Sequence, residues 1–178
     1  MPKLLTVIVP CYNEEENIQY FYEEFCKNDA YFLKHAIMYQ LIFVDDGSTD
    51  GTVTEIKNLH QRDKRVKLLS FSRNFGKEAA IYAGLQHASG NLVAIMDVDL
   101  QDPPSLLPQM IDEIFAGADQ VVARRTARQG EPRIRSWFAK FLTDKSNGWR
   151  KRLSCYEYAC CRSCSFRYRK ESLFQRNL

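Results

Sequence analysis

A short apolar run that ends in two acids constrains the fold of this chain more than any other stretch. Residues 92–96 read LVAIM, which is too short for a helix of its own and is typical of a strand covered on both faces in a parallel sheet. Because alternate side chains of an extended chain point the same way, we expect Asp97, Asp99 and Gln101 to converge just past the strand. Two carboxylates and an amide oxygen suit Mg²⁺ or Mn²⁺, which substrate phosphates usually complete.

A simpler interpretation stays open for the same acids. Asp97 and Asp99 can be loop carboxylates that end a strand and lead into a turn at Pro103 and Pro104. Two acids separated by one residue often occur by chance, so this pair alone does not decide between a cation site and a turn.

The order of the remaining apolar runs predicts the architecture. A helix after Asn13 would follow the first strand, with Asn13 as its cap and Ile18, Phe21 and Phe25 on its apolar face. We expect strands at 4–10, 41–44, 66–71, 92–96 and 120–123, and further helices from near residue 52, over 78–88 and over 106–115. Strands and helices that alternate in this way predict an α/β fold with a doubly wound parallel sheet.

Polar residues gather where the predicted strands end, which is the edge where open α/β sheets place ligands. Tyr12 is suited to stacking on a nucleotide base, and Asp45 to accepting hydrogen bonds from a ribose or a base. The residues expected along one crevice are Tyr12, Asp45, Asp97, Asp99, Gln101 and Arg125.

Turn chemistry is the alternative for residues 45–52, where Thr49 and Asp50 suit a capped turn without a ligand. Arg73 and Lys77 suit contacts with phosphates, but also solvation or pairing with nearby acids.

Composition limits the classes of partner. A chain of 178 residues is long enough for one well-buried domain, and no window approaches the roughly 18 consecutive apolar residues of a membrane span. The net charge of +3 is uneven: residues 148–178 carry +6, so residues 1–147 carry −3. We therefore expect no nucleic-acid partner for the folded part, and a cytoplasmic location, peripheral at most to the inner face of the membrane.

The last 31 residues differ from the rest of the chain. Residues 148–178 lack Val and Ile, hold six Arg, and contain four cysteines whose spacing fits none of the usual zinc knuckles. We expect this segment to be poorly packed or disordered, and a frameshift is one explanation for it. The predicted organisation is an incomplete ligand-binding domain at 1–147 and an atypical basic tail at 148–178. The early cysteines, Cys11 and Cys26, are expected to be reduced and buried.

Four motifs resemble family 2 glycosyltransferases of the GT-A fold. They read VIVPCYNEEENI, FVDDGSTDGT, SRNFGKEAAIYAGL and MDVDLQDPP, in the order seen in the branch of dolichol-phosphate mannose synthases and bactoprenol glucosyltransferases. The resemblance covers roughly residues 3 to 142. It implies a mainly parallel, Rossmann-like sheet that is truncated on the C-terminal side.

The resemblance also assigns roles to residues. It implies that Asp97 and Asp99 form a DxD site for Mg²⁺ or Mn²⁺, with Gln101 beside them, and that Arg125 meets the diphosphate. The nucleotide-binding residues that it implies are Pro10, Tyr12, Glu14, Phe43, Asp45, Asp97, Val98, Asp99 and Arg125. No catalytic base can be assigned, because family members carry a further acid after the point where the resemblance ends.

The reaction that this branch implies is inverting transfer of a sugar from a UDP- or GDP-sugar to a polyprenyl phosphate. Arg133 and Arg135 are suited to attracting that anionic headgroup. Two alternatives remain: a catalytically inactive nucleotide-binding fragment, and a phosphoryl switch of the receiver type. Receivers place their acid pair after the first strand, whereas Asp45 and Asp46 follow the second.

Overall fold

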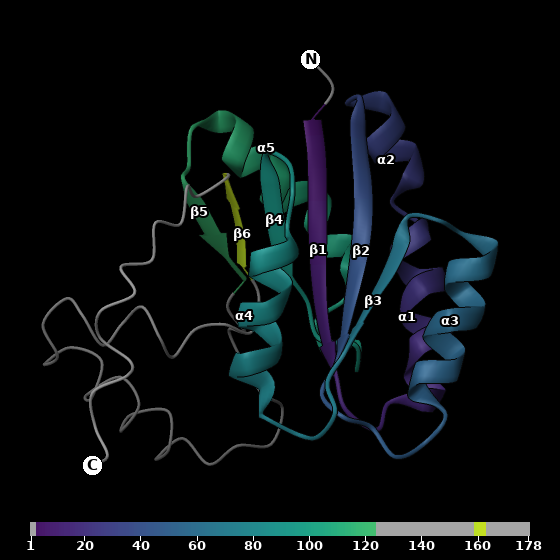
Figure 1. Ribbon diagram of the computed structural model, residues 1–178. Helices are drawn as coiled ribbons and strands as arrows, with labels where there is room; N and C mark the ends of the chain where they lie inside the picture. The colour runs from purple at the N-terminus through teal and green to yellow at the C-terminus, as the bar shows by residue number, and fades with distance from the viewer. Residues whose placement is uncertain (1–2, 124–158, 163–178) are drawn as a thin grey trace, which may run out of the picture.

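The computed structural model describes residues 3–123 and 159–162, and within them a six-stranded sheet forms the centre of the molecule (Figure 1). Its strand order is β3-β2-β1-β4-β6-β5. The strands are β1 (Lys3–Cys11), β2 (Ile37–Asp45), β3 (Val66–Ser70), β4 (Leu92–Ile95), β5 (Gln120–Val122) and β6 (Ala159–Arg162). The first four pair in parallel, whereas β6 runs antiparallel to both neighbours. The predicted mainly parallel sheet is confirmed.

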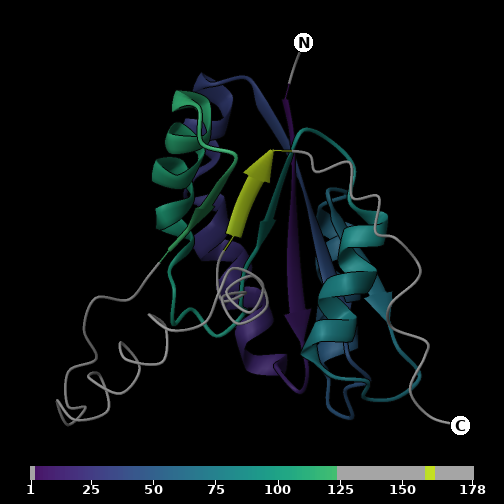
Figure 2. The same ribbon diagram turned by 90° about the vertical axis from the view of Figure 1, so that its left-hand side faces the viewer.

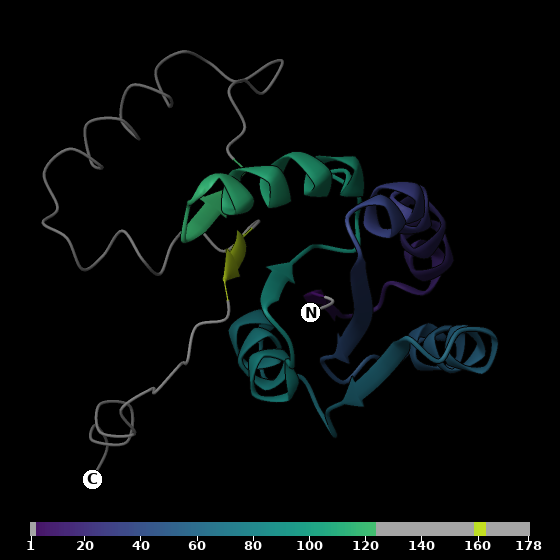
Figure 3. The same ribbon diagram turned by 90° about the horizontal axis from the view of Figure 1, so that it is seen from above.

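Helices cover both faces of this sheet (Figures 2 and 3). They are α1 (Glu15–Cys26), α2 (Asp29–Lys34), α3 (Thr52–Arg62), α4 (Lys77–His87), α5 (Leu107–Ala116) and a 3₁₀ turn, η1 (Pro104–Leu106). Alternate residues of β1 point to opposite faces: Val7 and its odd-numbered neighbours pack with α1, α3 and α5, whereas Ile8 packs against Ala80 and Ile81 of α4. Strand β4 is covered on both faces, as the apolar run predicts.

The chain path places a crevice beside β1. From β1 the chain moves outward through α1, β2 and α3 to β3, and α4 then returns across the other face to β4. Strand order therefore reverses between β1 and β4, and in open α/β sheets ligands bind outside the carboxyl ends of the strands at such a reversal.

Two local features differ from the sequence prediction. Helix α2 is absent from the sequence prediction. Strand β2 begins at Ile37 rather than near Leu41. The prediction missed its first half because buried and exposed side chains alternate there instead of forming an apolar run. Asn13 does not cap α1, since its φ is +54° and Glu14 occupies the cap position. The Asn13 side chain instead accepts a hydrogen bond from the backbone N–H of Thr49, at 2.9 Å.

Part of the predicted tail lies in the sheet. Residues 159–162 form β6 between β4 and β5, so the expectation of disorder is wrong for these four residues. The cysteines at positions 155 and 164 lie outside the described residues, and the domain division at residue 147 stays a prediction. In the described ranges, no helix has the length and apolar character needed to cross a membrane.

Candidate functional site

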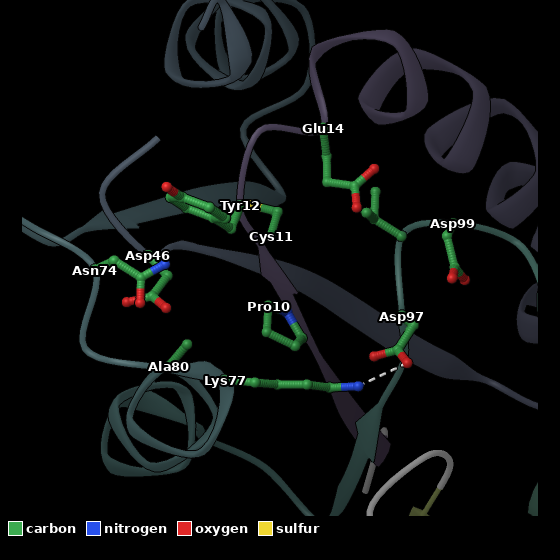
Figure 4. Close-up of a pocket in the computed structure, with 11 residues that line it drawn as sticks. Pro10, Cys11, Tyr12, Glu14, Asp46, Asn74, Lys77, Ala80, Asp97 and Asp99 are labelled. Atoms are coloured by element: carbon green, nitrogen blue, oxygen red, sulfur yellow. Dashed lines mark hydrogen bonds and ion pairs between the residues drawn. The ribbon is translucent and has the colours of Figure 1, made fainter. Parts of the chain in front are cut away.

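A pocket of about 310 Å³ lies at the carboxyl ends of β1 and β4, where the strand order reverses (Figure 4). Its lining residues are Pro10, Cys11, Tyr12, Glu14, Asp46, Asn74, Lys77, Ala80, Asp97, Val98 and Asp99. The predicted site residues from the ends of β1 and β4 therefore come together, although they are almost ninety positions apart in the sequence. The place that the topology favours for a ligand is thus also where the polar residues converge.

The acidic segment after β4 reaches the pocket by a different backbone path from the predicted one. Val98 and Asp99 lie in a turn and Leu100 has a φ of +55°, so the extended alternation assumed for residues 97–101 is wrong. Asp97 and Asp99 still line the same pocket. Gln101 is exposed, does not line the pocket, and donates its backbone N–H to Asp99 Oδ1 at 3.1 Å.

An ion pair crosses the floor of the pocket between α4 and the loop after β4. Lys77 Nζ lies 2.8 Å from Asp97 Oδ2, and the two side chains are 46% and 25% exposed. Figure 4 shows Lys77 extending along the pocket toward Asp97. Of the alternatives left open for Lys77, pairing with a nearby acid is the one that the structure contains. The other cation, Arg73, places its guanidinium 4.8 Å from the centre of the Phe75 ring.

The loop before α4 is fixed by Asp46. The carboxylate of Asp46 accepts hydrogen bonds from the backbone N–H groups of Phe75, at 2.7 Å, and Gly76, at 2.8 Å. Gly76 has a φ of +97°, a conformation that favours glycine, and Lys77 follows it directly. Sequence reasoning missed this role of Asp46. The available signal was the pair of adjacent acids, which exceeds what a turn requires.

Asp45 and Phe43 are predicted nucleotide contacts, but they do not line the pocket. Asp45 is 1% exposed and accepts hydrogen bonds from the backbone N–H of Ser48, at 3.0 Å, and the hydroxyl of Ser70, at 2.8 Å. Phe43 is fully buried and packs edge-on against Phe21. The structure gives both residues a structural surrounding, and their contact with a nucleotide stays a prediction.

Asp50, in the turn after β2, bonds to backbone groups of the protein. This is the capped turn that the alternative interpretation of residues 45–52 proposes. The Asp50 carboxylate accepts hydrogen bonds from the backbone N–H groups of Thr52, at 3.0 Å, and Glu15, at 3.2 Å. Gly47 approaches the backbone of the next loop so closely that a Cβ there would lie 2.4 Å from the carbonyl carbon of Arg73. The tight turn thus packs two loops of the site together.

The electrostatic environment at the end of β1 is negative. Burial, followed by the charges of Asp45, Glu14, Asp50 and Asp46, raises the pKa of the Cys11 thiol well above its ordinary value. Cys11 is therefore a protonated, buried thiol, as expected, whereas Cys26 is only partly buried. Of these acids, Glu14 and Asp46 line the pocket, so its lining is acidic near Cys11.

Comparison with known proteins decides the family. The family model described as Glycosyl transferase family 2 matches residues 6–175. The chain belongs to glycosyl transferase family 2. The match extends beyond residue 142, so the sequence resemblance underestimated how far the family pattern reaches.

Curated relatives of this glycosyltransferase family member include bactoprenol glucosyl transferases. The prophage bactoprenol glucosyl transferase homolog of Escherichia coli is 41% identical over 150 residues, covering 80% of this chain and 47% of the relative. The bactoprenol glucosyl transferase of Shigella phage SfV is 43% identical over 143 residues, covering 76% of this chain and 45% of the relative. This chain thus spans less than half the length of each relative.

Solved structures confirm the predicted GT-A type of fold. Mannosyl-3-phosphoglycerate synthase from Rubrobacter xylanophilus superposes with a TM-score of 0.66 and 19% identity, over 90% of this chain and 54% of that one. The mannosyltransferase PcManGT from Pyrobaculum calidifontis, in complex with GDP-Man and Mn²⁺, gives a TM-score of 0.58 and 24% identity, over 70% of this chain and 36% of that one.

The residues of this family member fit an open site for a divalent cation. Within the described part of the chain, no three His, Cys, Asp or Glu side chains could together hold a metal ion. Mg²⁺ and Mn²⁺ do not require such a cage, because one or two carboxylates and the substrate's phosphates usually bind them. Asp97 and Asp99 supply carboxylates in the same pocket, within a negative environment. Arg125 lies outside the described residues, so its assignment to the diphosphate stays a prediction.

Proposed function

We propose that this chain binds a UDP- or GDP-sugar and transfers the sugar, with inversion, to a polyprenyl phosphate. The observation that carries the proposal is the convergence of Asp97 and Asp99 with Tyr12 and Glu14 on one pocket at the reversal of strand order. Bactoprenol glucosyl transferases among the relatives support a lipid-phosphate acceptor, and PcManGT with GDP-Man and Mn²⁺ supports a nucleotide-sugar donor and a divalent cation.

We assign the lining residues different roles in donor binding. The Tyr12 ring, which follows β1 and is 45% exposed, would stack on the base. Asp97 and Asp99 would hold Mg²⁺ or Mn²⁺ beside the donor's diphosphate. When bound, that cation would offset the negative charge that builds on the departing diphosphate. Lys77, and by prediction Arg125, add positive charge from the protein.

The proposed acceptor reduces the need for a general base. A phosphate monoester has its second pKa near about 6, so at neutral pH it is mostly a dianion. One of its oxygens attacks the anomeric carbon of the sugar from the face opposite the nucleotide. The bond from that carbon to the diphosphate breaks, and the nucleoside diphosphate leaves with the electron pair. No proton must be removed from such an acceptor. We also propose that the chain works at the inner face of the membrane, where this lipid is reached from the cytoplasm.

Titration calorimetry with UDP and with GDP, each with and without Mn²⁺, tests donor binding, and a donor-hydrolysis assay then tests turnover. We expect one nucleotide to bind more tightly with Mn²⁺ and its sugar conjugate to be hydrolysed. Binding without turnover would favour the second candidate, an inactive nucleotide-binding protein. No Mn²⁺-dependent binding would refute both.

The receiver-type phosphoryl switch loses its support. Membership in a glycosyl transferase family opposes it. The acid pair on which it depended is also occupied, since Asp45 and Asp46 accept hydrogen bonds from the protein's own loops.

A further inference from the structure

The ammonium group of Lys77 forms an ion pair with a carboxylate oxygen of Asp97 that would also coordinate a divalent cation. Lys77 Nζ lies 2.8 Å from Asp97 Oδ2, and both residues line the pocket assigned to the cation and the donor. Among the lining residues, Lys77 is the one Lys or Arg, whereas Glu14, Asp46, Asp97 and Asp99 are acids. The ammonium group therefore supplies the positive charge of the pocket as the structure shows it.

The backbone brings Lys77 to this place. Asp46 is 4% exposed and holds the N–H groups of Phe75 and Gly76, the two residues before Lys77. Lys77 is also the first residue of α4, so its backbone is fixed on both sides. Its four-carbon side chain has the freedom to move the ammonium group while the backbone stays in place.

The Lys77–Asp97 pair is too exposed to be a strong structural contact. With side chains 46% and 25% exposed, an ion pair of this kind contributes little to stability and weakens as salt is added. A divalent cation at Asp97 would also repel an ammonium group a few ångströms away. The pair is therefore weak enough to be broken, and its presence opposes cation binding.

We propose that Lys77 is a displaceable counter-ion of Asp97. It neutralises the carboxylate while no divalent cation is bound, and it leaves Asp97 Oδ2 when Mg²⁺ or Mn²⁺ binds. This inference rests on the proposed function, because it takes Asp97 and Asp99 as the cation's carboxylates. The opposite role, in which Lys77 merely holds Asp97 in position for the cation, predicts the reverse effect of its removal.

Titration of the full chain with Mn²⁺ alone distinguishes these roles, with free Mn²⁺ followed by its electron paramagnetic resonance signal. Lys77→Met keeps a long side chain and removes the charge. We expect it to bind Mn²⁺ about three- to tenfold more tightly than the wild type at low ionic strength, with a smaller difference at high salt. Lys67→Met removes the same charge from an exposed position on β3 outside the pocket, and it should not change the affinity.

Two further variants locate the effect. In an Asp97→Asn background, Lys77→Met should no longer change Mn²⁺ affinity, because the pair no longer exists. A gain that persists there would overturn the proposal, as would equal or weaker Mn²⁺ binding by Lys77→Met in the wild-type background. Urea unfolding checks that each variant is folded.

The Asp99→Ala variant separates this inference from the proposed function. If Asp99→Ala loses Mn²⁺ binding while Lys77→Met binds Mn²⁺ like the wild type, the cation site is supported and the proposed role of Lys77 is refuted. If neither the wild type nor Lys77→Met binds Mn²⁺, either alone or with UDP or GDP present, both the cation site and the role of Lys77 are refuted.

Discussion

The Asp46 carboxylate at the end of β2 accepts a hydrogen bond from the backbone N–H of Gly76 at 2.8 Å, thirty positions later in the chain. The other carboxylate oxygen binds the N–H of Phe75. Because Lys77 follows Gly76, a buried acid of one loop sets where the cation of another element enters the pocket. Neighbouring loops at the strand ends are therefore coupled through the backbone.

Replacing Asp46 with Ala should destabilise the fold and release the loop before α4. The variant leaves the backbone N–H of Phe75 without its acceptor and leaves that of Gly76 with Asn74 Oδ1 at 3.1 Å, and we expect a loss of about 1–3 kcal/mol in the free energy of unfolding. Urea denaturation measures this loss. Asp119→Ala removes an exposed acid and should stay close to the wild type. Equal stability of the two variants would contradict the role of Asp46.

Replacing Gly47 with Ala should be more damaging than the same change at Gly117. Both glycines have positive φ, +75° and +122°, so both alanine variants carry backbone strain. A Cβ at Gly47 would lie 2.4 Å from the backbone of Arg73, whereas one at Gly117 would meet nothing within 4 Å. We expect Gly47→Ala to lose about 1–3 kcal/mol more stability than Gly117→Ala, measured by urea denaturation. Equal losses would show that the loops separate without cost.

Sequence periodicity correctly predicted the features that depend on regular strands and helices. The apolar run at 92–96 is a buried strand, and the predicted convergence of Tyr12, Asp97 and Asp99 on one edge follows from the parallel order of the strands. Periodicity failed at Gln101, because a turn and the positive φ of Leu100 replace the extended chain there.

Contacts between distant loops were beyond the reach of a single sequence. Besides the local contact with Ser48, Asp45 bonds to Ser70 of β3 and Asp46 to the loop after β3, and no local pattern connects these acids to those distant partners. Strand β6 was missed for a related reason, since its partner β4 lies far away in the sequence and no local pattern connects the two strands.

Acidification should remove a stabilising contact at Asp63. Partial burial alone would raise the pKa of Asp63, but hydrogen bonds from Arg65 and Tyr22 lower it below the ordinary value of 3.8. A lowered carboxyl pKa stabilises the fold above the unfolded value and loses that effect as pH falls through the folded value.

The Asp63→Asn variant tests this contribution. It should be less stable than the wild type at pH 7, by about 1 kcal/mol or less, because the Arg65 side chain of the pair is 45% exposed and solvent screens the charge. The difference should shrink below pH 3.8. Urea denaturation at the two pH values measures it, with Asp119→Asn as the control. A difference that stays constant with pH would assign the effect to packing instead.

Replacing Asp45 with Asn tests whether this buried acid also binds nucleotide. We expect about tenfold weaker binding of UDP or GDP in calorimetry, since a hydrogen bond to a charged group is worth about 1.5–3 kcal/mol. Ser70→Ala removes the hydroxyl partner of Asp45 and leaves the carboxylate, so nucleotide affinity should remain. If Asp45→Asn loses stability but keeps full nucleotide affinity, Asp45 serves the fold alone.

Replacing Asp99 with Ala should abolish the effect of Mn²⁺ on nucleotide binding. Asp99 is exposed, and its carboxylate accepts a hydrogen bond from the backbone N–H of Gln101. We therefore expect little change in stability. Asp99→Asn keeps an acceptor for that N–H but removes the charge, which separates the shape of the loop from its affinity for a cation. Calorimetry with UDP and GDP, with and without Mn²⁺, should show the same loss in both variants. Because Asp119→Ala removes an acid outside the pocket, its Mn²⁺ dependence should match the wild type. Unchanged Mn²⁺ dependence in Asp99→Ala would exclude Asp99 from the cation site and leave Asp97, already paired with Lys77, without a second carboxylate for the cation.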